Sequence, residues 1–197
     1  PLARAVVRGS QRAMVVADLP FGSYEASPEL ALATSIRFFK ESGVMAVKLE
    51  GAHVETVKKL TTSGIPVMGH LGLTPQSIYK FGTYAVRAKE EAEANLLVEH
   101  AKVLEAAGCF AIVLEKIPAS LGALVAQQVR IPIIGIGAGA GVDGQVLVMH
   151  DLLGITKNFS PRFLRRYLDL HSAILNATKQ YIQDVKQLDF PNNEEQY

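Results

Sequence analysis

The stretch GVMAVKLEG at residues 43–51 decides the fold, because it has the composition of a buried strand and ends in two charged residues. Side chains alternate across a strand, so Lys48 and Glu50 share one face while Val47 and Leu49 take the other. Two charged groups at the end of an apolar strand are costly to bury alone, and they need each other, a metal ion or a ligand. An internal ion pair and a functional site are therefore the two interpretations of this stretch.

Three other apolar segments also end in an ionisable residue. The segments that begin at residues 13, 65 and 110 end at Asp18, His70 and Glu115. In parallel α/β folds, ligands bind at the carboxyl ends of the strands. We therefore expect these three side chains to meet Lys48 and Glu50 in one site.

Six apolar strands alternate with helices along the chain, which indicates a parallel α/β sheet covered on both faces. Repeated strand–helix units build either a (β/α)8 TIM barrel or an open doubly wound sheet. An eight-unit barrel takes about 250 residues, so six units predict either an open sheet or a barrel without its first two βα units. The start at Pro1, in what reads as the middle of a helix, favours a single, N-terminally incomplete barrel domain over residues 1–197.

The expected helices begin and end at recognisable signals. Ser27, Pro28 and Glu29 form an N-cap, a first-turn proline and a first-turn acid, and Gly43 ends that helix. In a later helix at 89–107, the predicted buried face consists of Leu96, His100, Val103, Leu104 and Ala107. The other expected elements are helices at 54–64 and 121–129, strands at 131–137 and 145–149, a helical region at 160–187 and a polar tail at 189–197.

The composition argues against several classes of function. Lysine plus arginine number 20 and aspartate plus glutamate 19, without a basic run, so we expect no nucleic-acid partner. No apolar run approaches the roughly 18 residues that span a bilayer, so we expect no membrane partner. The single cysteine, Cys109, excludes an internal disulfide framework and is typical of a reducing compartment, which predicts a cytoplasmic protein. Its neighbours Ala107 and Phe110 indicate a small core residue rather than a nucleophile.

The residues at the strand ends suit a hard metal ion better than zinc. The chain has no set of thiolates and no HExxH helix, whereas carboxylates such as Asp18 and Glu50 suit magnesium. Magnesium can bind the carboxylate and ketone oxygens of an α-keto acid and stabilise the enolate formed from it. Lys48 would add positive charge at these oxygens, and Glu115 is the candidate general base. His70 would bind the substrate or relay a proton; the alternative is a core histidine.

Two further features favour structural roles. The glycine-rich segment GIGAG at 135–139 is not GxGxxG, and we interpret it as a turn rather than a phosphate-binding loop. The pair His150-Asp151 follows the last expected strand, and we interpret it as a structural hydrogen bond rather than a catalytic pair.

Several motifs occur in order along the chain: ADLPF at 17–21, VKLEG at 47–51, GHLGLTPQS at 69–77, LE at 114–115, IPIIGIGAG at 131–139 and DGQVLVMHD at 143–151. Together they resemble the ketopantoate hydroxymethyltransferase family over most of residues 8–155. The resemblance implies a magnesium-dependent (β/α)8 barrel of the phosphoenolpyruvate/isocitrate-lyase type, assembled as a homo-oligomer, often a decamer. It implies transfer of a hydroxymethyl group from 5,10-methylenetetrahydrofolate to 3-methyl-2-oxobutanoate, giving 2-dehydropantoate in pantothenate biosynthesis.

The resemblance also implies roles for the strand-end residues. Asp18 matches a metal ligand that also contacts the substrate, and Glu50 matches a metal-site carboxylate that acts through water. Lys48 and His70 match substrate-binding residues, and Glu115 matches the proton acceptor. The family's first two βα units, with a VGDS motif that supplies another metal-binding aspartate and a substrate-binding serine, are not in this chain.

Two other functions remain as alternatives. The first is a carbon–carbon lyase of the same barrel superfamily, which would cleave its substrate without folate. The second is a catalytically silent, truncated barrel whose role is assembly or binding. The long connection at 73–88, with Tyr79, Phe81 and Tyr84, is expected to cover the site or to line the folate channel.

Overall fold

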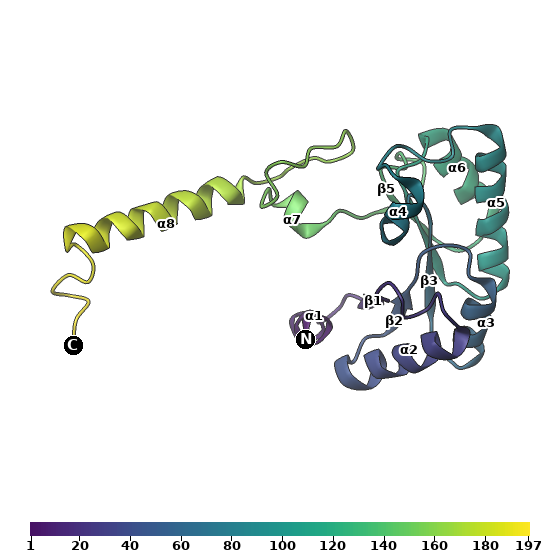
Figure 1. Cartoon of the computed structure of the whole chain (residues 1–197), viewed down its shortest axis with the longest axis horizontal. Helices are drawn as coiled ribbons and strands as arrows, with labels where there is room; N and C mark the ends of the chain where they lie inside the picture. Colours follow the sequence, from purple (N-terminus) through teal and green to yellow (C-terminus); the bar gives the residue numbers. More distant parts are fainter. The chain divides into compact units, whose positions relative to one another are not determined.

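The computed structural model describes all residues from 1 to 197 and divides them into two compact units, residues 1–146 and residues 147–197. The first unit contains the sheet and the helices that pack on it (Figure 1). None of the helices in the structure combines the length and the apolar character that crossing a bilayer requires.

One six-stranded sheet organises the first unit. Its strands are β1 (Val16–Asp18), β2 (Ala46–Lys48), β3 (Val67–Gly72), β4 (Ala111–Glu115), β5 (Ile133–Ile136) and β6 (Gly144–Gln145). They lie side by side in chain order, and every neighbouring pair is parallel. The sheet is open, because β1 and β6 lie at its two ends. The predicted parallel α/β architecture with six strands is confirmed.

The helices that connect the strands lie along one face of this sheet (Figure 1). They are α2 (Pro28–Ser42), α3 (Val54–Thr62), α5 (Glu91–Ala106) and α6 (Ala119–Gln128), while α1 (Leu2–Gly9) precedes β1 and contacts α2. The long connection after β3 contains η1 (Pro75–Ser77) and α4 (Ile78–Phe81). Helices on one face favour the predicted barrel over the open doubly wound sheet, because successive crossovers of one hand keep their helices on one side when the strands follow chain order.

The alternation of side chains along each strand separates the core from the site. Val47 and Leu49 of the β2 segment are fully buried against the helices, together with Val67 and Ile112 from β3 and β4. The residues between them, including Lys48, point to the opposite face, as the period of two requires. The predicted division of residues 46–50 between two faces is confirmed.

The predicted ends of α2 are also confirmed. The Ser27 hydroxyl accepts a hydrogen bond from the backbone N–H of Leu30 at 3.1 Å, and Pro28 occupies the first turn. Gly43 ends the helix in the left-handed region at φ +76°, where a residue without Cβ has no steric penalty.

The predicted buried face of α5 is wrong in part. The buried residues are Leu97, Ala101 and Leu104, whereas Leu96 and Val103 are 52% and 37% exposed. Two adjacent leucines lie about 100° apart around a helix, so either can start an i, i+4, i+7 stripe. Packing against β3 selects the stripe that starts at Leu97.

The predicted strand at 145–149 is wrong, because pairing with β5 stops at Gln145 and Met149–Leu152 form the short helix α7. Thus His150 and Asp151 lie on a helix rather than at a strand end. The last helix, α8 (Leu170–Gln187), begins ten residues later than predicted.

Side-chain hydrogen bonds explain where α8 begins. The Arg166 guanidinium donates to the carbonyl oxygens of Thr156, Lys157 and Phe159, which holds the preceding segment in an irregular conformation. Asp169 is the N-cap, since its carboxylate accepts from the backbone N–H of Ser172 at 3.1 Å. Hydrogen bonding from the Ser172 side chain, and secondly from its backbone N–H, lowers the pKa of Asp169.

Gly72, the last residue of β3, is required by the close approach of β4. It has φ +88°, and a Cβ at this position would lie 2.3 Å from the carbonyl oxygen of Glu115. We expect Gly72→Ala to lower the free energy of unfolding by about 3 kcal/mol, since it combines a left-handed backbone penalty with a clash against backbone. Urea denaturation measures this change.

Gly64→Ala is the matched control. Gly64 has a similar φ of +82°, but nothing lies within 4 Å of its added Cβ. This variant is expected to lose about 1 kcal/mol, from the backbone penalty alone. Equal losses in the two variants would show that the contact between β3 and β4 does not require glycine.

Candidate active site

The strand-end residues lie on the face of the sheet opposite the helices, at its carboxyl edge. Asp18 pairs in register with Lys48 across β1 and β2, and Gly72 pairs with Glu115 across β3 and β4. His70 is two residues before Gly72 on β3. Because all neighbouring strands are parallel, their last residues meet at one edge, as predicted.

Lys48 joins two carboxylates from different strands. Its Nζ lies 2.8 Å from Asp18 Oδ2 and 3.2 Å from Glu50 Oε1. The side chain of Glu50 is 3% exposed and that of Asp18 is 53% exposed, so one pair is buried and the other is in contact with solvent. The internal ion pair considered above is therefore present, and it forms part of the cluster rather than replacing it.

His70 connects this group to the remaining carboxylate. Its Nε2 lies 3.3 Å from Glu115 Oε2, and its Nδ1 lies 3.8 Å from Glu50 Oε1. The His70 side chain is 3% exposed, and neither ring nitrogen has a partner in hydrogen-bond geometry. Buried polar atoms without a hydrogen bond are rare in proteins and are typical of functional positions. The five predicted residues thus form one continuous chain of contacts.

Sequence reasoning missed two residues that contact this cluster. The Gln76 backbone N–H donates to Glu50 Oε2 at 2.9 Å, and the Tyr24 hydroxyl accepts from the Glu50 backbone N–H at 3.3 Å. Gln76 falls inside the motif GHLGLTPQS, but its residue type gave no sign of a role. Tyr24 lies in the polar loop after β1, where its burial to 2% exposure had no periodic signal.

The donor set is compatible with magnesium only if water and substrate supply most of the ligands. No group of three or more His, Cys, Asp or Glu side chains is placed to enclose a metal ion. Both Glu50 oxygens already have protein partners, whereas the half-exposed Asp18 carboxylate is accessible. Magnesium in proteins commonly keeps several waters and takes one or two carboxylates. Asp18 as a direct ligand and Glu50 through water meet that requirement.

Two cavities border the cluster from different sides. Asp18 lines one of about 470 Å³ that also contains Val16 and Phe38, and Glu50 lines another of about 660 Å³ beneath the loop after β3. Neither cavity contains both carboxylates, which are joined instead through the Lys48 ammonium group.

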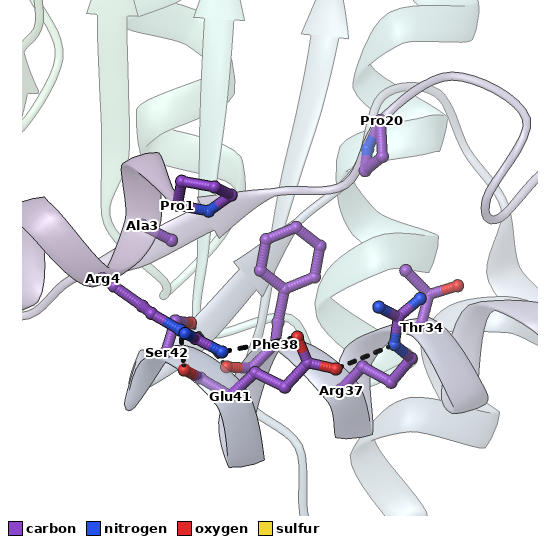
Figure 2. Close-up of a pocket in the computed structure, with 9 residues that line it drawn as sticks. All are labelled: Pro1, Ala3, Arg4, Pro20, Thr34, Arg37, Phe38, Glu41 and Ser42. Atoms are coloured by element: carbon purple, nitrogen blue, oxygen red, sulfur yellow. Dashed lines mark hydrogen bonds and ion pairs between the residues drawn. The ribbon is translucent and has the colours of Figure 1, made fainter.

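A third cavity, of about 470 Å³, lies between α1 and α2 and contains none of the five residues (Figure 2). Its charged groups are already paired, since Glu41 contacts Arg37 at 3.0 Å and Arg4 at 3.7 Å. The ring of Phe38 stands among these residues in the figure. We assign no chemistry to this cavity.

The glycine-rich segment after β5 packs closely against α6. A Cβ on Gly139 would lie 2.4 Å from the Cβ of Ala119, and the Gln145 side-chain amide donates to the Gly139 carbonyl oxygen at 2.8 Å. These contacts account for glycine at 139 and support the interpretation of the segment as a structural turn.

Comparisons with known proteins agree with this architecture. A family model described as ketopantoate hydroxymethyltransferase matches residues 1–193. The 3-methyl-2-oxobutanoate hydroxymethyltransferase of Flavobacterium johnsoniae is 62% identical over 197 residues, which are 99% of this chain and 72% of that protein. The protein with the same name from Porphyromonas gingivalis is 60% identical over 196 residues, covering 98% of this chain and 72% of its own length.

Two solved structures support the barrel type. A putative phosphonomutase from Burkholderia cenocepacia has a TM-score of 0.52 at 15% identity and covers 94% of this chain and 75% of its own. A phosphonopyruvate hydrolase has a TM-score of 0.51 at 10% identity, covering 98% of this chain and 70% of its own. The fold is therefore a partial parallel barrel that resembles those of the phosphonomutase and the phosphonopyruvate hydrolase, as expected.

The two ion pairs of Lys48 differ in burial, which predicts different costs for breaking them. Lys48→Met leaves the buried Glu50 carboxylate without a cation and is expected to lower the free energy of unfolding by about 3 kcal/mol. Asp18→Asn removes only the half-exposed charge and is expected to cost less than about 1 kcal/mol. Urea denaturation of both variants at pH 7 measures the difference, and equal costs would contradict the assigned burial.

Cys109 lies outside the site and is 3% exposed. Burial raises the pKa of its thiol to about 12, so the reactive thiolate is scarce at pH 8. We expect no reaction of the native protein with a disulfide reagent at pH 8 until denaturant is added. The exposed variant Asn193→Cys is the control and is expected to react at once. Rapid labelling of Cys109 in the native protein would contradict its predicted core position.

Proposed function

The chain belongs to the ketopantoate hydroxymethyltransferase family, so its activity is 3-methyl-2-oxobutanoate hydroxymethyl transfer in pantothenate biosynthesis, and we propose a mechanism that uses the five clustered residues. In this proposal the one-carbon donor is 5,10-methylenetetrahydrofolate and the product is 2-dehydropantoate. The observation that supports the mechanism is the unbroken chain of contacts from Asp18 to Glu115 at the carboxyl edge of the sheet.

Lys48 and Asp18 bind the keto acid in this proposal. The Lys48 ammonium group has three N–H donors, of which two face carboxylates, so one remains for an oxygen of the substrate. Asp18 is accessible to solvent and to a metal ion, and Glu50 supports that ion through water. Bound magnesium would polarise the ketone oxygen and stabilise the negative charge that develops there.

Glu115 removes the proton from the carbon beside the ketone. Its side chain is 16% exposed, so the carboxylate is largely shielded from water while still reachable from the inner face of the sheet. His70 lies beside this carboxylate, with Nε2 3.3 Å from Glu115 Oε2, and its ring nitrogens bind the substrate in this proposal. A positioned base of this kind contributes about 10²–10⁴-fold to proton abstraction.

The electron pair released by deprotonation forms the new carbon–carbon bond. The substrate carbon attacks the methylene group of the folate, and water supplies the hydroxyl oxygen. As these two bonds form, both bonds from the methylene carbon to the two folate nitrogens break, and each nitrogen takes up one proton. The proton taken by Glu115 leaves to solvent or to the folate nitrogen. The net change consumes one water and gives tetrahydrofolate and 2-dehydropantoate.

The same proposal extends to the surroundings of the site. The connection at 73–88 is ordered into η1 and α4, and Lys116 donates a hydrogen bond to the carbonyl oxygen of Tyr84 within it. We propose that this connection borders the folate channel. A cytoplasmic homo-oligomer, a decamer by the family resemblance, remains part of the proposal.

Glu115→Gln tests the assignment of the base. With magnesium and 3-methyl-2-oxobutanoate in deuterium oxide, we expect this variant to exchange the substrate proton at least 10²-fold more slowly than the unsubstituted protein, because the amide is not a base. Proton NMR follows the loss of the signal from the carbon beside the ketone.

Glu99→Gln is the matched control, since Glu99 is an exposed carboxylate on α5 that only approaches Lys102 at 4.0 Å. It is expected to exchange at the original rate. Undiminished exchange in Glu115→Gln would remove Glu115 from the role of base. Turnover of the keto acid without folate would support a lyase instead, and absence of both exchange and saturable magnesium binding would support a silent barrel.

A further inference from the structure

We propose that Gln76 is a positioning residue that fastens the loop after β3 to the ends of β1 and β2 and thereby sets the orientation of the Asp18 and Glu50 carboxylates. The kinetic part of this inference rests on the proposed function, whereas its structural part does not. Gln76 lies in η1, and its backbone N–H and both polar atoms of its side chain contact the candidate site or its supports.

Four contacts attach Gln76 to three different segments. Its backbone N–H donates to Glu50 Oε2 at 2.9 Å, beyond the end of β2. Its side-chain Nε2 donates to the Leu19 carbonyl oxygen at 2.9 Å and lies 3.5 Å from Asp18 Oδ1, both at the end of β1. Its Oε1 accepts from the Tyr24 hydroxyl at 3.0 Å. Through its backbone N–H and its side chain together, Gln76 therefore joins the segments that follow β1, β2 and β3.

These contacts complete the set of partners around the two carboxylates. Asp18 has Lys48 at Oδ2 and Gln76 at Oδ1, and Glu50 has Lys48 at Oε1 and Gln76 at Oε2. When both oxygens of a carboxylate have a donor, its plane cannot rotate freely. The loop after β3 consequently contributes directly to the direction in which both carboxylates point.

Tyr24 holds the Gln76 side chain in place through a hydrogen bond. It is 2% exposed, its hydroxyl accepts from the Glu50 backbone N–H at 3.3 Å, and it donates to Gln76 Oε1.

The geometry requires an amide at position 76. An amide presents donors to the Leu19 carbonyl oxygen and the Asp18 carboxylate, and an acceptor to Tyr24. A glutamate of the same length would retain the acceptor but would place a negative charge beside Asp18. The change Gln76→Glu therefore replaces the two contacts with Leu19 and Asp18 by repulsive ones while preserving size and shape.

The kinetic test compares Gln76→Glu with the unsubstituted protein. We expect the KM for 3-methyl-2-oxobutanoate to rise about tenfold, because each charged or polar hydrogen bond of this kind is worth roughly that factor. At saturating keto acid, proton exchange is expected to change less than threefold, since Gln76 makes no contact with Glu115. Loss of folded protein alone would instead lower the maximal rates of transfer and of proton exchange by the same factor and would leave KM unchanged. An unchanged KM, or a loss confined to kcat, overturns the proposal.

Limited digestion by trypsin provides a readout that needs no activity. Lys80 is exposed on α4, four residues after Gln76, and cleavage there reports release of the loop. We expect cleavage at Lys80 about tenfold faster in Gln76→Glu and faster to a smaller extent in Tyr24→Phe, which keeps the other Gln76 contacts. The site of cleavage is identified from the masses of the fragments.

Ser77→Ala is the control for both measurements, because Ser77 is adjacent in η1 and its hydroxyl makes no hydrogen bond in the structure. It is expected to match the unsubstituted protein in KM and in cleavage at Lys80. Cleavage of Gln76→Glu at the original rate overturns the proposal. If the unsubstituted protein transfers no hydroxymethyl group, the proposed function fails, and the trypsin result alone decides whether Gln76 holds the loop.

Discussion

The contact of one ammonium group with two carboxylates is the interaction on which the rest of the site depends. Glu50 is buried, and a buried carboxylate is tolerated only where cations and donors replace its lost hydration. Lys48 supplies the cation, and its second contact with Asp18 couples the ends of β1 and β2. The register of these strands, which places Asp18 opposite Lys48, is therefore both a feature of the sheet and a condition for the site.

Strand alternation explains how one short segment serves both the core and the chemistry. Val47 and Leu49 pack against helices on one face, while Lys48 and Glu50 contribute to the charged cluster. A shift in register by one residue would exchange these sets and bury the charges among the helices. The hydrophobic core consequently fixes the direction of the charged side chains, and the function of the cluster depends on the packing behind it.

The parts of the structure that sequence reasoning predicted are those governed by local rules. The helix ends at Ser27 and Gly43 and the meeting of four strand ends follow from capping and from parallel topology. The buried face of α5 depended on tertiary packing, because Leu96 and Leu97 are equally apolar. Gln76 depended on loop geometry, which has no period, and no pattern in residue type could have identified its contacts.

β1 lies at one edge of the sheet and carries Asp18 of the charged cluster. β1 is an edge strand, so one side of its backbone carries unpaired N–H and C=O groups that can template the addition of another strand. Its length of three residues limits how firmly such an addition can hold. A chain segment that joined this edge in the parallel sense would end beside Asp18 and would change the electrostatic environment of its half-exposed carboxylate. The three residues of β1 thus carry both the edge of the sheet and one carboxylate of the charged cluster.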